Sequence, residues 1–257
     1  MCKFRLLLAL FPTNCVSYYQ AHMKFGKGKE AICQRSMIMA IELPLFPLNV
    51  VLFPGADLPL HIFEARYRLM IKECHEQDKP FGVVLARPNS PLMHEEPYPV
   101  GTLADILALS RMDDGRMNLI ARGGQRFRIL EQHHEKPYLT GIVEIYTDLP
   151  ESEHVLRLQA DKLRELFNTY LEILLEVVGK SETQFNLPDE PEELSHFVAY
   201  FLDIEDEEKQ QLLEMNLTTE RLESVIETLR REVPFVRQML SMSKIYHAGG
   251  PDRSKLN

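Results

Sequence analysis

The chain has 257 residues, 45% hydrophobic and 26% charged, which is long enough for one large domain or two small ones with a buried core. Its formal net charge of −9 disfavours broad electrostatic binding of nucleic acid, and no stretch is apolar for long enough to predict a membrane-spanning helix. The charge is uneven, since residues 1–36 hold six lysines and arginines but one acid, leaving 23 bases and 37 acids in the rest.

Residues 1–36 differ from the rest of the chain in composition. Three explanations are open: a disordered leader or an over-long start assignment, an organellar or secretory targeting segment, or an extra folded element. We prefer the first because Met37 and Met39 stand directly before the first predicted strand. Beyond the leader the single cysteine is Cys74, which allows no disulfide framework and predicts a reducing, cytoplasmic location, with organellar targeting left open.

Residues 41–71 combine alternating apolar residues with four prolines, Pro44, Pro47, Pro54 and Pro59. Because proline donates no backbone hydrogen bond, we expect these prolines to be excluded from paired central strands. The segment therefore predicts short strands that turn corners in a small, irregular barrel. A helix is predicted over residues 64–77. Its apolar stripe is formed by Phe63, Tyr67, Met70, Ile71 and Cys74.

Further strands follow this helix. Residues 80–88 predict a short apolar strand, residues 89–99 a loop, and residues 138–147 the last strand. Between them, residues 101–111 and 116–130 predict a hairpin because Asp114-Gly115 separates two β-like runs. Gly123-Gly124 interrupts the return strand and predicts a bulge or a close backbone approach.

The hydrophobic period changes to that of helices near residue 150. Helices are predicted over residues 153–178, 191–202 and 206–215, followed by one that starts with Thr218 as its N-cap. Strands followed by helices predict an α+β fold. We expect a barrel subdomain over 37–150, a helical subdomain over 151–245 and a disordered tail over 246–257.

No motif for catalysis or metal binding stands out. Gly26-Lys27-Gly28-Lys29 lacks the spacing and the Ser/Thr of a phosphate-binding loop, and no two histidines have HExxH spacing. The segment SMSK (residues 241–244) gives no sign of a buried lysine that could activate a serine. We therefore expect no catalytic residue, no metal and no cofactor.

Two polar features are candidates for binding. Arg122, Arg126 and Arg128 alternate along one predicted strand, so that all three are expected on one face. They form either a solvated face paired with acids such as Asp105 or Glu131, or a strip that recognises carboxylates or other anions. His61 either makes a structural hydrogen bond near the start of the helix or contacts a ligand.

The segments LPLFPLNVVLFPG (residues 43–55) and LPLHIFEARYR (residues 58–68) closely resemble the N-terminal, substrate-binding domain of Lon proteases. GTLA (101–104), the DGR turn (114–116) and the GGQRF run (123–127) match the same pattern in order and spacing. The chain is most similar to stand-alone bacterial proteins that lack the ATPase and peptidase domains. The resemblance implies a PUA-like β pseudo-barrel with one helix, followed by an α-helical bundle.

The resemblance also implies a function. It favours a non-catalytic module that binds unfolded or client polypeptides and works with a separate protease or chaperone, with the oligomeric state undetermined. The candidate binding surface is His61, Phe63, Arg66, Arg122, Arg126 and Arg128. RNA binding through a PUA-like barrel is one alternative, although the acidic charge opposes it, and a hydrolase related to Lon peptidase is another.

Overall fold

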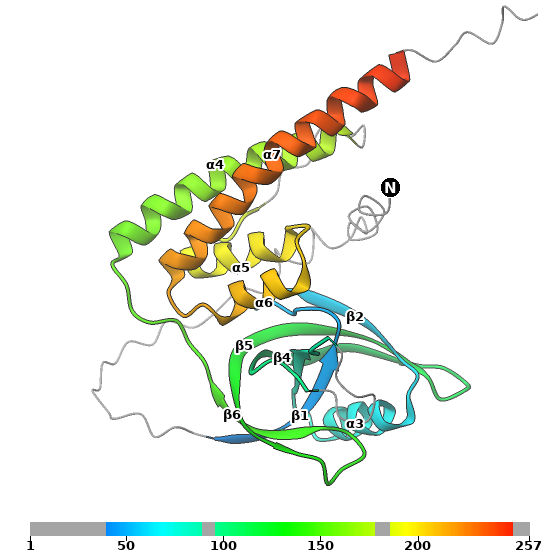
Figure 1. The fold of residues 1–257 in the computed structure, drawn as a ribbon. Helices are drawn as coiled ribbons and strands as arrows, with labels where there is room; N and C mark the ends of the chain where they lie inside the picture. Colours follow the sequence, from blue (N-terminus) through cyan, green and yellow to red (C-terminus); the bar gives the residue numbers. More distant parts are fainter. Residues whose placement is uncertain (1–39, 89–95, 178–185, 249–257) are drawn as a thin grey trace, which may run out of the picture.

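The computed structural model describes residues 40–88, 96–177 and 186–248 (Figure 1). Its strands are β1 (Ile41–Leu48), β2 (Asp57–Ile62), β3 (Phe81–Leu85), β4 (Val100–Arg111), β5 (Met117–His133) and β6 (Thr140–Ile145). Its helices are α3 (Ala65–Glu76), α4 (Glu153–Val177), α5 (Pro191–Phe201), α6 (Asp206–Glu214) and α7 (Thr218–Ala248). This order confirms the α+β prediction. The predictions for residues 1–36, 89–95 and 249–257 lie outside the described residues.

Strand β1 changes its partner half-way along. Its first half, to Pro44, pairs antiparallel with β6, and its second half, from Leu45, pairs parallel with β3. Pro44 and Pro47 therefore lie inside a paired strand, and the prediction that they are excluded from one is wrong. Because each half is paired with one neighbour, a proline can direct its missing N–H to the other edge.

The other two prolines occupy positions that suit their chemistry. Pro54 and Gly55 form a tight turn in which Gly55 has φ +78° and the Ala56 N–H donates to the Phe53 carbonyl at 3.1 Å. This conformation favours glycine after proline. Pro59 lies in β2, which pairs with β5 at the edge of the sheet.

Helix α3 confirms the predicted amphipathic helix. Tyr67, Met70, Ile71 and Cys74 are buried, and the Tyr67 ring packs 4.2 Å from that of Phe46 on β1. The prediction for Phe63 is wrong, because its side chain is 62% exposed. Phe63 precedes the helix, which begins at Ala65, so the helical period does not apply to it.

Strands β4 and β5 form the predicted hairpin. Gly115 has φ +81° in its turn, and the Met112 N–H donates to the Arg116 carbonyl at 2.9 Å. The sheet order is β2-β5-β4-β3-β1-β6, and β5 also pairs with β6, so that five strands close into a ring and β2 lies at the edge. The close approach predicted near Gly123 is confirmed. A Cβ atom there would lie 2.2 Å from the Phe53 carbonyl oxygen.

The four later helices pack together beside the sheet, and α4 and α7 lie side by side (Figure 1). Pro191 occupies the first turn of α5, as predicted. Thr218 is not an N-cap, because it begins α7 and its hydroxyl donates to Asp148. Instead, the Thr219 N–H donates a hydrogen bond to a carboxylate oxygen of Glu151 at 3.1 Å.

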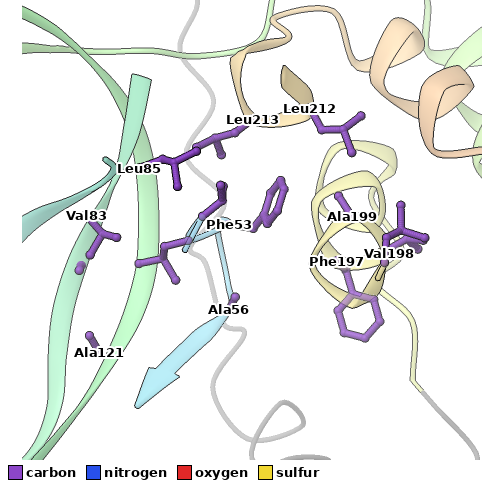
Figure 2. Close-up of a cluster of buried hydrophobic side chains, with 14 of the residues drawn as sticks. Phe53, Ala56, Val83, Leu85, Ala121, Phe197, Val198, Ala199, Leu212 and Leu213 are labelled. Carbon is purple, nitrogen blue, oxygen red and sulfur yellow. The ribbon is translucent and has the colours of Figure 1, made fainter. Parts of the chain in front are cut away.

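One hydrophobic cluster joins the sheet to the helices (Figure 2). The fully buried Phe53 lies in the loop between β1 and β2, close to Ala199 on α5 and Leu213 on α6. A smaller cluster lies among β1, β3, β5 and β6: Leu43, Leu45, Val84, Phe127, Leu139 and Val143. The division at residue 150 stays a prediction, but the larger cluster crosses it.

Candidate functional site

The end of β2 exposes an aromatic pair. The ring of Phe63 stacks on that of His61, with their centroids 6.2 Å apart. The His61 Nδ1 atom is 2.6 Å from the Asn118 Oδ1 atom on β5, so the predicted hydrogen bond near the helix start is confirmed. This hydrogen bond and the strand pairing fix the position of the His61 ring. The exposed ring of Phe63 stacks on it.

The strand register extends this pair into an exposed surface. Residues directly opposite in antiparallel strands point to the same face of a sheet. The pairing of β2 with β5 and of β5 with β4 therefore makes three rungs, which are His61–Asn118–Ser110, Pro59–Ile120–Ala108 and Asp57–Arg122–Asp105. We call these nine residues, with Phe63 and Leu107, the outer face. Its middle is apolar, and Ile120, Leu107 and Phe63 are all exposed.

The free edge of β2 is less suited to binding than this face. Gly123 donates its N–H to the Ala56 carbonyl, which sets the alternation of bonded pairs along β2 and β5. By this alternation Pro59 falls in a non-bonded pair, and its missing N–H faces the free edge. An added strand would therefore lack one hydrogen bond, at Pro59, and proline is common in protected edge strands.

Charged side chains border the apolar middle of the outer face at both ends. Arg122 donates to both carboxylate oxygens of Asp57, at 2.7 and 3.0 Å. Beyond Phe63, Arg66 bonds Glu64 at 2.9 Å and lies over the Tyr67 ring. These contacts hold the charged groups in place around the apolar middle.

The three arginines do not form one solvated strip, so that prediction is wrong. Arg122 is half-buried and pairs with Asp57 on β2. Arg126 is 2% exposed and lies against the helices. Arg128 is exposed, 3.8 Å from Glu144, and lies over the Tyr146 ring that also contacts Arg126. A register shift next to Gly123 separates Arg122 from the other two.

Arg126 belongs to a buried ionic network that the sequence analysis missed. Asp148 receives hydrogen bonds from Arg126, from Arg221 and from the Thr218 hydroxyl. Arg126 also donates to the carbonyls of Leu213 and Met215, at the end of α6. Carbonyls at a helix C-terminus carry partial negative charge, which helps to balance two arginines on one carboxylate.

The pKa values reflect this environment. Burial would raise the pKa of Asp148, but hydrogen bonds and charge from Arg221, with smaller contributions from Thr218 and Arg126, hold it below its usual value. Burial lowers the pKa of Arg126, and the nearby Arg221 lowers it further. Burial raises the pKa of Glu192, and the nearby charge of Asp148 also raises it. The network links β5 to α7 through the segment between β6 and α4.

His196 lies beside this network, fully buried on α5. Its ring centroid is 6.1 Å from that of Phe53, and its Nε2 atom has no hydrogen-bond partner among the described residues. Burial, with the charges of Arg221 and Arg126, lowers the pKa of His196 well below its usual value. The histidine is therefore neutral at neutral pH.

The family model for the substrate-binding domain of ATP-dependent protease La (LON) matches residues 42–231. The chain belongs to the Lon substrate-binding domain family. The match includes all of the outer face and the ionic network. In Lon proteases this domain is the non-catalytic, substrate-binding part.

Individual Lon proteins agree with this assignment. The chain is 30% identical over 223 residues to the Lon protease of Anaeromyxobacter dehalogenans, covering 84% of this chain and 26% of that protein. For the Lon protease of Escherichia coli the identity is 27% over 208 residues, covering 77% of this chain and 26% of that protein. The chain thus spans about a quarter of the length of these relatives.

Solved structures of Lon N-terminal domains share the fold. A Lon N-terminal domain protein from Xanthomonas campestris has a TM-score of 0.54 and 26% identity, covering 73% of this chain and 98% of that one. The N-terminal domain of the Mycobacterium avium complex Lon protease has a TM-score of 0.55 and 19% identity, covering 74% and 98%. The second match shows the fold alone.

Reactive groups in the described part of this Lon-type domain are few. Burial raises the pKa of the Cys74 thiol to about 11, so this thiol is a poor nucleophile. Residues 40–88, 96–177 and 186–248 contain no cluster of three or more metal-ligating side chains. No helix within those ranges has an apolar run that could cross a membrane.

Proposed function

We propose that this chain is a non-catalytic module that holds unfolded or client polypeptides on its outer face. The observation that carries the proposal is the exposed apolar middle of that face, built on paired strands and headed by Phe63. Exposed apolar patches with polar rims are typical of protein-binding surfaces, and aromatic side chains often anchor them. The match to the substrate-binding domain of the Lon family supports the same function.

The chemistry of the face suits polypeptides in general. Phe63, Ile120 and Leu107 offer apolar contact. His61, Asn118 and Ser110 add polar groups along one rung of the face. The charged groups at its ends are largely paired with each other, so they add little selectivity. Such a face would capture many apolar segments weakly.

We also infer the architecture, the partner and the location of the module. The ring of strands is a PUA-like barrel, the later helices form a bundle, and the module passes clients to a separate protease or chaperone. The free, buried Cys74 supports a reducing, cytoplasmic location. The chain itself hydrolyses nothing, so purified protein should leave casein intact with and without ATP.

RNA binding has less support. It depended on a continuous basic strip, and Arg122, Arg126 and Arg128 have three different environments instead. A protein with few unpaired cations on one face would gain little from counterion release.

The test is binding of fluorescently labelled, chemically unfolded casein to the full chain, followed by anisotropy. Phe63→Asp combined with Ile120→Asp should weaken binding by about tenfold or more, because each apolar contact becomes a buried charge. The control is Leu158→Asp on α4, where the native side chain is similarly exposed at 52%. Circular dichroism should show that all variants remain folded.

Two results would refute this function. One is wild-type affinity for unfolded casein no higher than that of an unrelated protein of similar charge. The other is an equal loss of affinity in the outer-face variant and in the Leu158→Asp control, since that pattern would report added negative charge alone.

A further inference from the structure

Strand β4 has a free edge over its second half. It pairs with β3 only through Thr102, Leu103 and Ala104, whereas its pairing with β5 continues to Arg111. No other strand in the described part of the chain pairs with β4 beyond Ala104. Residues 105–111 therefore form an unpaired edge, on the side of the outer face opposite to β2.

The hydrogen bonds of the β4–β5 hairpin determine which backbone groups face this edge. The Met112 N–H donates to the Arg116 carbonyl at 2.9 Å, so these two residues form a bonded pair. Bonded and non-bonded pairs alternate along antiparallel strands, so Arg111 and Leu109 fall in non-bonded pairs with β5. Their N–H and C=O groups therefore point away from β5, towards the free edge.

The edge lacks the protection that proline gives to β2. Proteins guard exposed edges with proline, lysine, bulges or a covering element. A bulge at Leu107 interrupts the pairing with β5, but residues 108–111 follow it in regular register and include no proline or lysine. Ala108, Ser110 and Arg111 are exposed. This end of β4 therefore presents hydrogen-bonding groups that a second extended chain can reach.

We propose that an extended client segment adds to this edge as a further strand of the sheet. The inference rests on the proposed function, because it takes the client polypeptide as the occupant. The backbone groups of Leu109 and Arg111 match those of any extended chain, which is what an unfolded polypeptide offers. Leu107 of the outer face lies beside the edge, so one client can contact both.

The two faces of the sheet determine which side chains suit this added strand. Leu107 and Ala108 lie on the outer face, whereas Ile106 and Leu109 are half-buried and pack against the larger hydrophobic cluster. Client side chains would alternate between these faces, and both offer apolar contact. Backbone pairing with Leu109 and Arg111 also disfavours proline at the matching positions. The preferred clients are thus short apolar segments, rich in β-branched residues and free of proline.

A second copy of the chain fits this edge less well. Residues 108–111 span only about 13 Å at about 3.3 Å per residue, so edge-to-edge pairing would form few hydrogen bonds. A stable dimer buries about 800 Å² on each partner, far more than so short an edge provides. An unfolded client is free to continue from the edge onto Leu107 and Ile120 of the outer face.

The test uses a fluorescent peptide of about eight residues, with alternating valine and threonine between terminal lysines. A matched peptide carries N-methyl groups on its central residues, which removes backbone donors but keeps every side chain. In anisotropy titrations the full chain should bind the unmethylated peptide at least about tenfold more tightly. Arg111→Pro should bind it about tenfold more weakly than the control Arg111→Ala, which loses the same charge but keeps the N–H.

Two further measurements support this comparison. Circular dichroism should show that both variants remain folded, because proline is tolerated where its missing N–H faces a free edge. Amide hydrogen exchange locates the contact. Exchange in residues 105–111 should slow when the peptide binds, and it should slow more there than in residues 57–62 of β2.

Three results would overturn the proposal. Equal affinity for the two peptides would exclude backbone pairing, and slower exchange in residues 57–62 rather than 105–111 would place the peptide on β2. A wild-type dimer that Arg111→Pro converts to a monomer would show that the occupant is a second copy. If casein binds but the peptide does not, or both peptides bind equally, the added strand is refuted and the proposed function stands.

Discussion

Replacing Asp148 by Asn tests how the sheet and the helices are held together. The Asp148 carboxylate is the shared acceptor for Arg126 on β5 and Arg221 on α7, whose side chains are 2% and 0% exposed. An amide keeps the shape of the carboxylate but loses its charge and turns an NH₂ donor towards the arginines. Two buried cations would then have no anion bonded to them.

The expected loss of unfolding free energy is about 3–5 kcal/mol, the usual effect of removing one partner from a buried ion pair. Carbonyls of Leu213 and Met215 stay bonded to Arg126, which argues against a larger value. A typical domain is stable by about 5–15 kcal/mol, so the variant should still fold at 25 °C.

Urea unfolding followed by circular dichroism measures this loss. The control is Glu144→Gln, the same chemical change in the exposed pair with Arg128, and it should cost no more than about 1 kcal/mol. Adding Arg126→Met to Asp148→Asn should cost less than the two single losses together, because it removes one of the uncompensated charges.

A loss below about 1 kcal/mol for Asp148→Asn would refute this account of the junction. So would strict additivity with Arg126→Met. The pH dependence gives an independent check. The folded Asp148 pKa is below the unfolded value of 3.8, so its contribution is complete at neutral pH and is lost as pH falls through the folded value.

Two further predictions concern Gly123 and His196. Gly123→Ala should lower the free energy of unfolding by about 1–3 kcal/mol, because the new Cβ would lie 2.2 Å from the Phe53 carbonyl oxygen. Gly124→Ala should cost much less, because the nearest atom to its Cβ would be 3.6 Å away. Equal urea midpoints for the two variants would contradict this. The folded His196 pKa is below 6.5, so the unfolded chain takes up the proton first and stability should fall as pH drops below 6.5. His196→Leu should flatten this slope between pH 7 and 5.5, and an unchanged slope would exclude His196 as its source.

Local signals predicted much of the fold. Asp114-Gly115 marked a hairpin because its turn needs a glycine with positive φ, and the period of Tyr67, Met70 and Ile71 marked α3 because a helix buries one stripe. These features depend on residues close together in the chain. The outer face was predicted in part, since His61, Phe63 and Arg122 lie on it.

The environment of Arg126 could not be predicted in this way. Its burial depends on the carbonyls at the end of α6, 87 and 89 residues away in sequence, and on Asp148, which lies just outside every predicted strand and helix core. Period-two spacing predicts which side chains share one face of a strand. It does not predict which other elements of the chain pack against that face.

The network of Arg126, Asp148 and Arg221 decides how the outer face is held relative to the helices. Arg126 lies four residues beyond Arg122 of the outer face on the same strand, and Arg221 lies in the first turn of α7. Apolar contact alone, as between Phe53 and α5, would allow the helices to slide over the sheet, because it has no direction. Two arginines that share one carboxylate and reach the α6 carbonyls allow far fewer orientations. A client bound on the outer face would therefore keep a fixed position relative to the helices.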